Sequence, residues 1–388
     1  MFAVWCMFAN RGCRRVVLCA MAAGALVVPV TSAAQATGGT PANPRWAAPP
    51  TVEWPTKDGV YTIQNFRFGS GETLPQLRLH YLTLGTPHRD AGGHVDNAVL
   101  LLHGTGGSAS SLLAAQLSTV LFGPGQLLDI TRYFLILPDD IGHGKSSKPS
   151  DGLHMRFPKY DYDDMVASQH QMLLDGLHVD HLRLILGTSM GCMQAFVWGE
   201  TFPDFADALM PLACAPMPIA GRNRMMRYMA IMAIEDDPEW HGGDYTKEPI
   251  EGVRTAAELV FVMGTAPLYE QNLAPTKQEA EAYMDDYLAK RVPPLDANDT
   301  IYQFDASRNY DPSGHLDRIK VPVMWINSAD DFVNPPELGV GDKYARKLAR
   351  GKFVLIPISD ATRGHGTHTQ AAIWKDYLAE LLKESEKK

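Results

Sequence analysis

The sequence has no long run of lysine and arginine after residue 15, and its formal net charge is −9 over 388 residues. Nucleic-acid binding depends largely on basic side chains that neutralise phosphates. We therefore expect no nucleic-acid partner. Internal repeats and low-complexity tracts are also missing, which argues against a repeat array. With 45% hydrophobic and 20% charged residues, the composition is that of a globular protein.

Cysteine is scarce in this chain. Of five cysteines, Cys6, Cys13 and Cys19 lie in the N-terminal segment, which leaves only Cys192 and Cys214 for the rest. Two cysteines cannot provide a disulfide framework for a fold of this size. A single bridge between them could form in an oxidising compartment, but we expect two separate buried thiols.

Long hydrophobic runs are absent apart from residues 16–30 near the N-terminus. This run contains Pro29 and is shorter than the roughly 20 residues that a membrane-spanning helix needs. Arginines precede it, and small residues suited to cleavage follow at 32–36. That order is typical of a secretory signal. We predict that residues 1–36 are a signal peptide, that the mature protein is periplasmic or secreted, and that it keeps no stable membrane span.

The segments that follow differ in composition and periodicity. Residues 37–58 are rich in proline, glycine, alanine and threonine, which predicts an extended, loosely held N-terminal arm. Alternating stretches at 61–68 and 77–84 predict a pair of antiparallel strands.

From residue 98 onward, short apolar runs alternate with helical segments. Nearly continuous apolar strands separated by helices indicate a mostly parallel sheet with helices on both faces. The sequence therefore predicts an α/β fold with a core of residues 59–216 and 311–388. The expected buried strands are Ala98–Leu102, Tyr133–Leu137, Leu182–Leu186, Ala208–Ala213, Val321–Ile326 and Phe353–Ile356.

Residues 217–310 interrupt this alternation with helical patterning and no clear buried strand. We interpret them as a helical cap inserted into the core. Within the cap, Met225, Met226, Met229 and Met232 recur at helical spacing. We expect this methionine stripe to pack against the core, although methionine is also suited to an adaptable acyl pocket.

The segment from Gly187 to Gly191 fits the motif G-x-S-x-G, with Ser189 at its centre. It follows an expected strand and precedes a helical segment at 192–200. A sharp strand-to-helix turn of this kind exposes a nucleophilic serine at the edge of a sheet. Ser189 is therefore the predicted nucleophile.

A serine hydroxyl needs a base to accept its proton, and in this arrangement the partners follow in the order Ser, acid, His. Only His365 and His368 follow the last plausible acid loop. We favour His365, which stands between two glycines on a loop, and keep His368 as the alternative. The two histidines could also resemble a metal pair, but no cysteine or acidic ligands accompany them.

The predicted acid is Asp331, just beyond the expected strand 321–326, where a carboxylate can orient an imidazole. Its neighbour Asp330 is the fallback. Either could instead be a solvated loop carboxylate that caps its own turn.

Stabilising the developing oxyanion requires backbone donors that are in place before the reaction. We predict the N–H groups of Met190 and Thr105 for this role, because Thr105 follows the strand 98–102 in a His-Gly-Thr-Gly-Gly loop. His103 is expected to be a structural residue of that loop. Gly106-Gly107 lacks the Lys-Ser/Thr ending of a phosphate-binding loop. We predict neither a cofactor nor a metal.

These elements together resemble the α/β-hydrolase superfamily, and within it the homoserine O-acetyltransferase-like branch. The resemblance covers most of residues 60–382 and implies the same roles for Ser189, Asp331 and His365. The similar segments are Gly187 to Ala195, Tyr81 to Gly85, Asn97 to Gly104 and Asp331 to Pro336.

Two departures from that branch bear on function. Where the acetyltransferases carry an aspartate that can engage the amine of their substrate, this chain has Gly366 after His365. The signal peptide is a second departure, because acetyl-CoA is a cytoplasmic donor. Both favour water as acyl acceptor, and so a serine hydrolase of a small-molecule carboxylic ester. The alternative is an O-acyltransferase with the same triad; a binding protein without turnover is a third hypothesis. The sequence is compatible with a homodimer.

Overall fold

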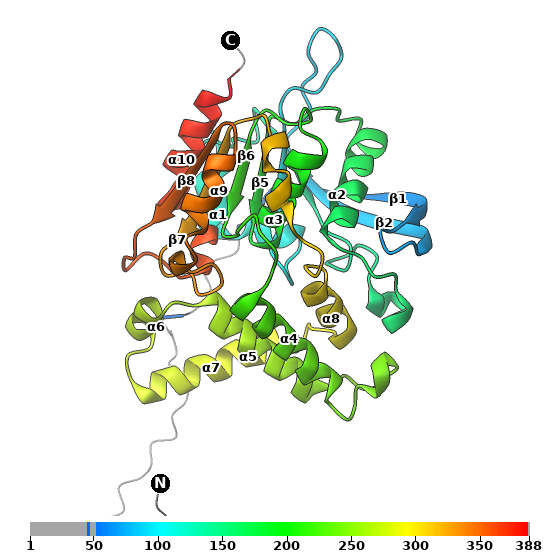
Figure 1. The fold of residues 1–388 in the computed structure, drawn as a ribbon, viewed down its shortest axis with the longest axis vertical. Coiled ribbons are helices and arrows are strands. Elements are labelled where there is room, and N and C mark those ends of the chain that lie inside the picture. The colour runs from blue at the N-terminus through cyan, green and yellow to red at the C-terminus, as the bar shows by residue number, and fades with distance from the viewer. Residues whose placement is uncertain (1–44, 47–51, 387–388) are drawn as a thin grey trace, which may run out of the picture. The chain divides into compact units, whose positions relative to one another are not determined.

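The computed structural model describes residues 45–46 and 52–386. The predicted signal peptide lies outside the described residues, as does most of the predicted arm. The described chain contains an eight-stranded sheet with the order β1-β2-β4-β3-β5-β6-β7-β8 (Figure 1). Its strands are β1 (Lys57–Arg67), β2 (Thr73–Leu84), β3 (Ala98–Leu102), β4 (Phe134–Pro138), β5 (Leu184–Thr188), β6 (Leu209–Leu212), β7 (Val323–Ser328) and β8 (Gly351–Ile356).

The strand pairing confirms the predicted α/β class. β1 pairs with β2, and β2 with β4, in antiparallel fashion. The remaining neighbours in the sheet, β4, β3, β5, β6, β7 and β8, pair in parallel. The predicted arm of residues 37–58 extends too far, because Lys57 and Asp58 already belong to β1. It is also not loosely held at Trp54, whose indole Nε1 donates to Ser118 Oγ at 3.0 Å.

Helices cover both faces of the sheet. Alternate residues of a strand point to opposite sides, so each face presents apolar side chains that a helix can bury. Leu100 and Leu102 belong to a buried cluster with α2, α3 and α9, whereas Val99 and Leu101 belong to a second cluster with α1 and α10. These helices are α1 (Ala115–Leu121), α2 (Tyr162–Gln171), α3 (Met190–Thr201), α9 (Val340–Tyr344) and α10 (Ala371–Glu384).

Five α-helices lie between β6 and β7 and gather at one end of the sheet (Figure 1). Buried residues of α4, α5 and α8, such as Ile234, Val253 and Ile301, form an apolar cluster of their own. We refer to these helices as the cap. They are α4 (Gly221–Glu235), α5 (Ile250–Gly264), α6 (Pro267–Leu273), α7 (Lys277–Arg291) and α8 (Ala297–Asp305).

The methionine stripe on α4 does not pack against the core as expected. Met226 is buried, but Met225, Met229 and Met232 are 65%, 52% and 40% exposed. Their side chains lie on the outer face of the helix, because Ala230, Ile234 and their neighbours occupy the inner face. None of the described helices is both long enough and apolar enough to cross a membrane.

Cys192 and Cys214 form a disulfide, so the expectation of two separate thiols is wrong. Cys192 lies in the first turn of α3 and Cys214 two residues beyond β6. Because β5 leads into α3 and pairs with β6, the two Cα atoms come within 5.9 Å, a normal separation for a disulfide.

Candidate active site

Ser189 occupies the turn between β5 and α3, at the carboxyl end of the sheet. Its backbone has φ 53° and ψ −107°, a conformation that costs a non-glycine residue about 1–3 kcal/mol. The Ser189 N–H donates to Leu212 O on the neighbouring strand at 2.8 Å, which helps to fix the turn. The strained turn directs the hydroxyl out of the sheet, as a nucleophile requires.

The two glycines of the motif allow this turn to pack closely. A Cβ on Gly187 would lie 2.0 Å from Gly191 O, and one on Gly191 would lie 2.4 Å from Leu102 O. Both distances are impossible for a side chain. The spacing G-x-S-x-G is therefore a packing requirement of the strand-turn-helix unit.

The structure brings Ser189, His365 and Asp331 together in one hydrogen-bonded chain. Ser189 Oγ lies 2.8 Å from His365 Nε2, and His365 Nδ1 lies 2.9 Å from Asp331 Oδ2. His365 stands on the loop between β8 and α10, and Asp331 follows the end of β7. This geometry lets the imidazole accept the hydroxyl proton while the carboxylate orients the ring.

Asp331 is held as a buried carboxylate. Burial alone would raise its pKa, but the attraction of His365 and hydrogen bonds from His365 and Asn334 hold the pKa of Asp331 below its ordinary value. The backbone N–H groups of Val333 and Asn334 donate to Asp331 Oδ1 at 2.7 and 3.0 Å. Asp330 is bonded elsewhere, to the hydroxyls of Ser328 and Thr362.

His368 lies beside His365, with ring centroids 5.2 Å apart, but it forms no hydrogen bond with Ser189. Burial, together with the nearby His365, lowers the pKa of His368 to about 3. It is therefore a neutral neighbour of the triad. Within residues 45–46 and 52–386, no group of three or more His, Cys, Asp or Glu side chains is placed to hold a metal ion.

The predicted oxyanion donors lie on the two segments that flank Ser189. Met190 begins α3, and Thr105 lines the same cavity as Ser189. The adjoining Gly104 packs so closely that a Cβ there would lie 3.3 Å from Ser189 Cβ. Gly191 N donates to His103 O at 3.0 Å, which ties the Thr105 loop to the start of α3.

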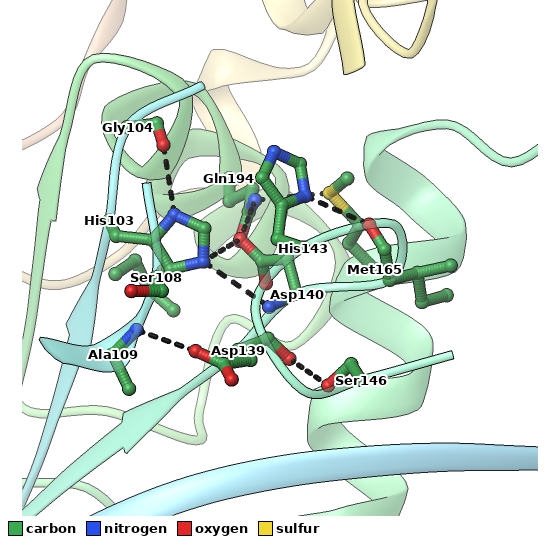
Figure 2. A network of polar contacts seen from close by, with 12 residues as sticks. His103, Gly104, Ser108, Ala109, Asp139, Asp140, His143, Ser146, Met165 and Gln194 are labelled. Atoms are coloured by element: carbon green, nitrogen blue, oxygen red, sulfur yellow. Dashed lines mark hydrogen bonds and ion pairs between the residues drawn. The ribbon is translucent and has the colours of Figure 1, made fainter. Parts of the chain in front are cut away.

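A buried polar network holds the loop of residues 103–107 in place (Figure 2). Asp140 is 1% exposed and accepts hydrogen bonds from the side-chain amides of Gln194, at 2.8 Å, and Gln169. Its own N–H donates to His103 Nε2 at 3.3 Å, and His103 Nδ1 donates to Gly104 O at 2.9 Å. Burial raises the pKa of Asp140 above its ordinary value. His103 thus has structural contacts within its loop, and it joins residues 103–107 to α3 through Asp140 and Gln194.

The sequence reasoning missed Asp140 and Gln169 as parts of this network. Gln194 lies within the segment that resembles the acetyltransferase elbow, and that resemblance was the only signal for it. Asp140 lies on the loop after β4 and Gln169 on α2, and these elements meet α3 only in the folded chain.

Ser189 and His365 open into a cavity of about 700 Å³, its mouth included, between the sheet and the cap. The cap contributes most of its wall, and that wall is mainly apolar. We call it the cap cavity. Its apolar lining includes Ala256, Ala257, Val260, Met263, Leu295 and Phe304.

Two arginines that sequence reasoning did not single out also line the cap cavity. Arg227 on α4 is only 3% exposed; its Nε donates to Asn223 Oδ1 at 2.9 Å, and its Nη1 has no partner. Arg291 ends α7. Neither Arg227 nor Arg291 forms a salt bridge with a carboxylate of the described residues, and no Asp or Glu among them lines this cavity. The cavity is therefore electropositive and suited to a carboxylate, which arginine binds in a bidentate manner.

Comparison with known proteins agrees with this arrangement. A family model described as "alpha/beta hydrolase fold" matches residues 97–359. The chain is 31% identical over 306 residues to a "Probable acyltransferase" of Methanothermobacter thermautotrophicus, covering 79% of this chain and 91% of that protein. It is 34% identical over 360 residues to a homoserine O-acetyltransferase of Geobacter sulfurreducens, covering 82% and 95%.

A solved structure shares the fold as well. An acetylester hydrolase from Corynebacterium glutamicum superposes with a TM-score of 0.74 at 21% identity, over 84% of this chain and 96% of that one. At this identity the likeness concerns the fold alone.

Proposed function

Because the chain belongs to the α/β-hydrolase family, within its homoserine O-acetyltransferase-like branch, we propose that it hydrolyses a small carboxylic ester through an acyl-enzyme at Ser189. The observation that carries this proposal is the hydrogen-bonded chain from Ser189 through His365 to Asp331.

The reaction has two halves. Ser189 Oγ attacks the ester carbonyl carbon while His365 Nε2 takes its proton, and the N–H groups of Thr105 and Met190 stabilise the oxyanion. The carbon–oxygen bond to the alcohol then breaks, and His365 returns the proton to the departing alcohol. In the second half, His365 deprotonates a water that attacks the acyl-enzyme, and the acid leaves as Ser189 regains its proton.

Water is favoured as acceptor because the described lining of the cap cavity offers no carboxylate to bind an ammonium group. Among the described residues no carboxylate lines the cap cavity, and Gly366 stands directly after His365. An amino-acid acceptor would place its charged amine in an electropositive space without a counter-charge.

The same two arginines favour a substrate with a negative charge. A carboxylate at the far end of the acyl part would lie against Arg227, which lines the cap cavity and has an Nη1 without a hydrogen-bond partner. Hydrogen bonds to charged groups contribute about 1.5–3 kcal/mol each. We therefore propose esters of a dicarboxylic acid, with one carboxylate left free.

The second candidate function is O-acyl transfer with the same triad. The names of the two relatives at 31% and 34% identity favour it. The first half-reaction would be unchanged, and an alcohol would replace water in the second.

A partition experiment separates the two. The mature protein is incubated with a succinate hemiester and increasing concentrations of an acceptor such as homoserine, and free acid and transfer product are quantified. Hydrolysis predicts that free acid accounts for nearly all turnover at every acceptor concentration. Diversion of most acyl groups to the acceptor would reject hydrolysis in favour of transfer. A Ser189→Ala control should give neither product.

We further propose that the protein is exported to the periplasm or secreted. The N-terminal pattern of residues 1–36 supports export, and so does the Cys192–Cys214 disulfide, since disulfides persist in oxidising compartments. The protein recovered from a periplasmic or culture fraction should begin at residue 35 or 37. Full-length chain confined to the cytoplasm would reject export.

A further inference from the structure

A second cavity meets the cap cavity at the nucleophile. It measures about 800 Å³, its mouth included, and shares Thr105, Ser189, Arg291 and His365 with the cap cavity. Its other walls come from the core, not the cap. We call it the loop cavity, after the two loops that line it, residues 103–107 and the loop that carries His365; residues 111–117, which include Gln116 at the start of α1, form a further wall.

The loop cavity has polar walls with unused hydrogen-bonding capacity. Thr105, Gln116 and His368 line it, and each has a buried side-chain atom without a hydrogen-bond partner: Thr105 Oγ1, Gln116 Oε1 and His368 Nδ1. Leaving a buried polar atom unsatisfied costs about 1–3 kcal/mol, so such atoms are normally paired. Three of them around one cavity indicate a ligand that supplies the missing partners.

The chemistry of these atoms indicates a hydroxyl-bearing ligand. Thr105 and Gln116 are neutral, and burial lowers the pKa of His368 to about 3, so its imidazole is neutral as well. Hydroxyl groups can both donate to Gln116 Oε1 and exchange hydrogen bonds with a neutral imidazole and a threonine hydroxyl. Arg291, at the border with the cap cavity, is the only Lys, Arg, Asp or Glu side chain among the described residues of this wall.

We propose that the loop cavity binds the alcohol part of the ester, as an alcohol with further hydroxyl groups, while the cap cavity holds the acyl part. This inference rests on the proposed ester hydrolysis. The two arms of an ester diverge from its carbonyl carbon, and the two cavities share Ser189 but are otherwise lined mostly by different residues. The alcohol must depart beside the proton donor His365, and the loop cavity is the one whose wall continues along that loop to His368 and Thr369.

The test compares two hemiesters of one acid, monoethyl succinate and mono(2,3-dihydroxypropyl) succinate. Gln116→Leu removes the amide at similar size. We expect it to lower kcat/KM about tenfold for the dihydroxypropyl ester, the equivalent of one lost hydrogen bond. For the ethyl ester the change should be less than twofold. Gln76→Leu, on an exposed position of β2, is the matched control and should change neither.

A second readout uses the timing of alcohol release. Once the acyl-enzyme has formed, the alcohol has left, so the deacylation rate in a stopped-flow experiment should be the same for both esters and unchanged by Gln116→Leu. An equal loss for both esters, or a changed deacylation rate, would overturn the assignment.

Binding to the Ser189→Ala variant keeps this test independent of turnover. Calorimetry should show tighter binding of the dihydroxypropyl ester than of the ethyl ester, and the added Gln116→Leu change should abolish the difference. If this preference is present but the wild type hydrolyses neither ester, the proposed hydrolysis fails and the subsite stands. If the preference is absent, the subsite is rejected even when hydrolysis is observed.

Discussion

Asp330 and Asp331 are adjacent in the chain, yet their carboxylates belong to different parts of the site. Asp331 bonds His365 and the turn at Val333 and Asn334. Asp330 bonds Ser328 and Thr362, which links β7 to the loop after β8. The two residues therefore offer a matched pair for testing which carboxylate orients the imidazole.

Replacing Asp331 by Asn should lower kcat/KM by roughly 10³–10⁴-fold, because an amide neither stabilises the imidazolium nor holds the required tautomer. The Asp330→Asn variant should stay within about tenfold of the wild type. Steady-state hydrolysis of one ester by both variants, with folding checked by circular dichroism, makes the comparison. A larger loss in Asp330→Asn than in Asp331→Asn would reassign the acid.

At this scale the sequence predicted the residues that a motif or chain order could specify. Ser189 came from its glycine spacing, and His365 from the order of the triad. Arg227 and Asp140 could not be found in this way. A buried arginine is indistinguishable in sequence from one on a helix surface, and the contacts of Asp140 come from three separate elements.

At the scale of single elements, α3 is the helix on which the site depends. It begins at the nucleophile turn, carries Gln194 of the buried network, and packs between the sheet and α2. Near its other end stands Glu200, whose Oε2 is buried without a hydrogen-bond partner. Burial and the nearby Asp163 raise the pKa of Glu200 to about 7, against a partial offset from Arg318.

The raised pKa predicts a pH-dependent stability contribution. Between pH about 4.5 and 7 the folded state binds the Glu200 proton more tightly than the unfolded state. Stability from this group is therefore present at low pH and is lost as pH rises through 7. Glu200→Gln should raise Tm relative to the wild type more at pH 8 than at pH 5.

Thermal unfolding across this range measures the difference, with the exposed Glu235→Gln on α4 as control. The control should show no such trend. A Tm difference between Glu200→Gln and the wild type that is constant from pH 5 to 8 would contradict the raised pKa.

The elements themselves were predictable where local patterns determine them. Each expected strand lies within two residues of an observed one at its start and end, and for the inner strands this is because a continuous apolar run is what a doubly covered strand requires. The expectation of burial is wrong for the edge strand β8, in which only Ile356 is buried. The prediction that the methionine stripe packs against the core was wrong, because a local pattern does not show where a helix sits in the fold. Its helical spacing shows that four residues share a face, but not which face meets the core.

At the scale of the whole molecule, the Cys192–Cys214 disulfide joins α3, the helix that follows the nucleophile, to the segment just beyond the end of β6. Cys214 O accepts hydrogen bonds from Trp325 Nε1 and Asn327 Nδ2 on β7, the strand that leads to Asp331. The disulfide thus fastens together elements that carry two members of the triad. Sequence could not predict it, because only the order of strands β5 and β6 in the sheet makes the cysteines neighbours.

Removing this link by Cys192→Ala and Cys214→Ala together should lower the free energy of unfolding by about 3 kcal/mol, since the bridge closes a loop with a sequence separation of 22. Urea denaturation under oxidising conditions measures the loss. With reductant present throughout unfolding, the wild type should shift most of the way towards the variant. Equal stability of both proteins under oxidising conditions would contradict the bridge.

The central claim is that His365 and Asp331 activate Ser189 as a nucleophile. Reaction of the protein with a fluorophosphonate, followed by intact mass and peptide mapping, tests it without reference to substrate. We predict one adduct per chain, located on Ser189, and a labelling rate at least about a hundredfold lower in a folded His365→Ala variant. No adduct on Ser189 in the wild type, or equal labelling rates in both proteins, would contradict the account.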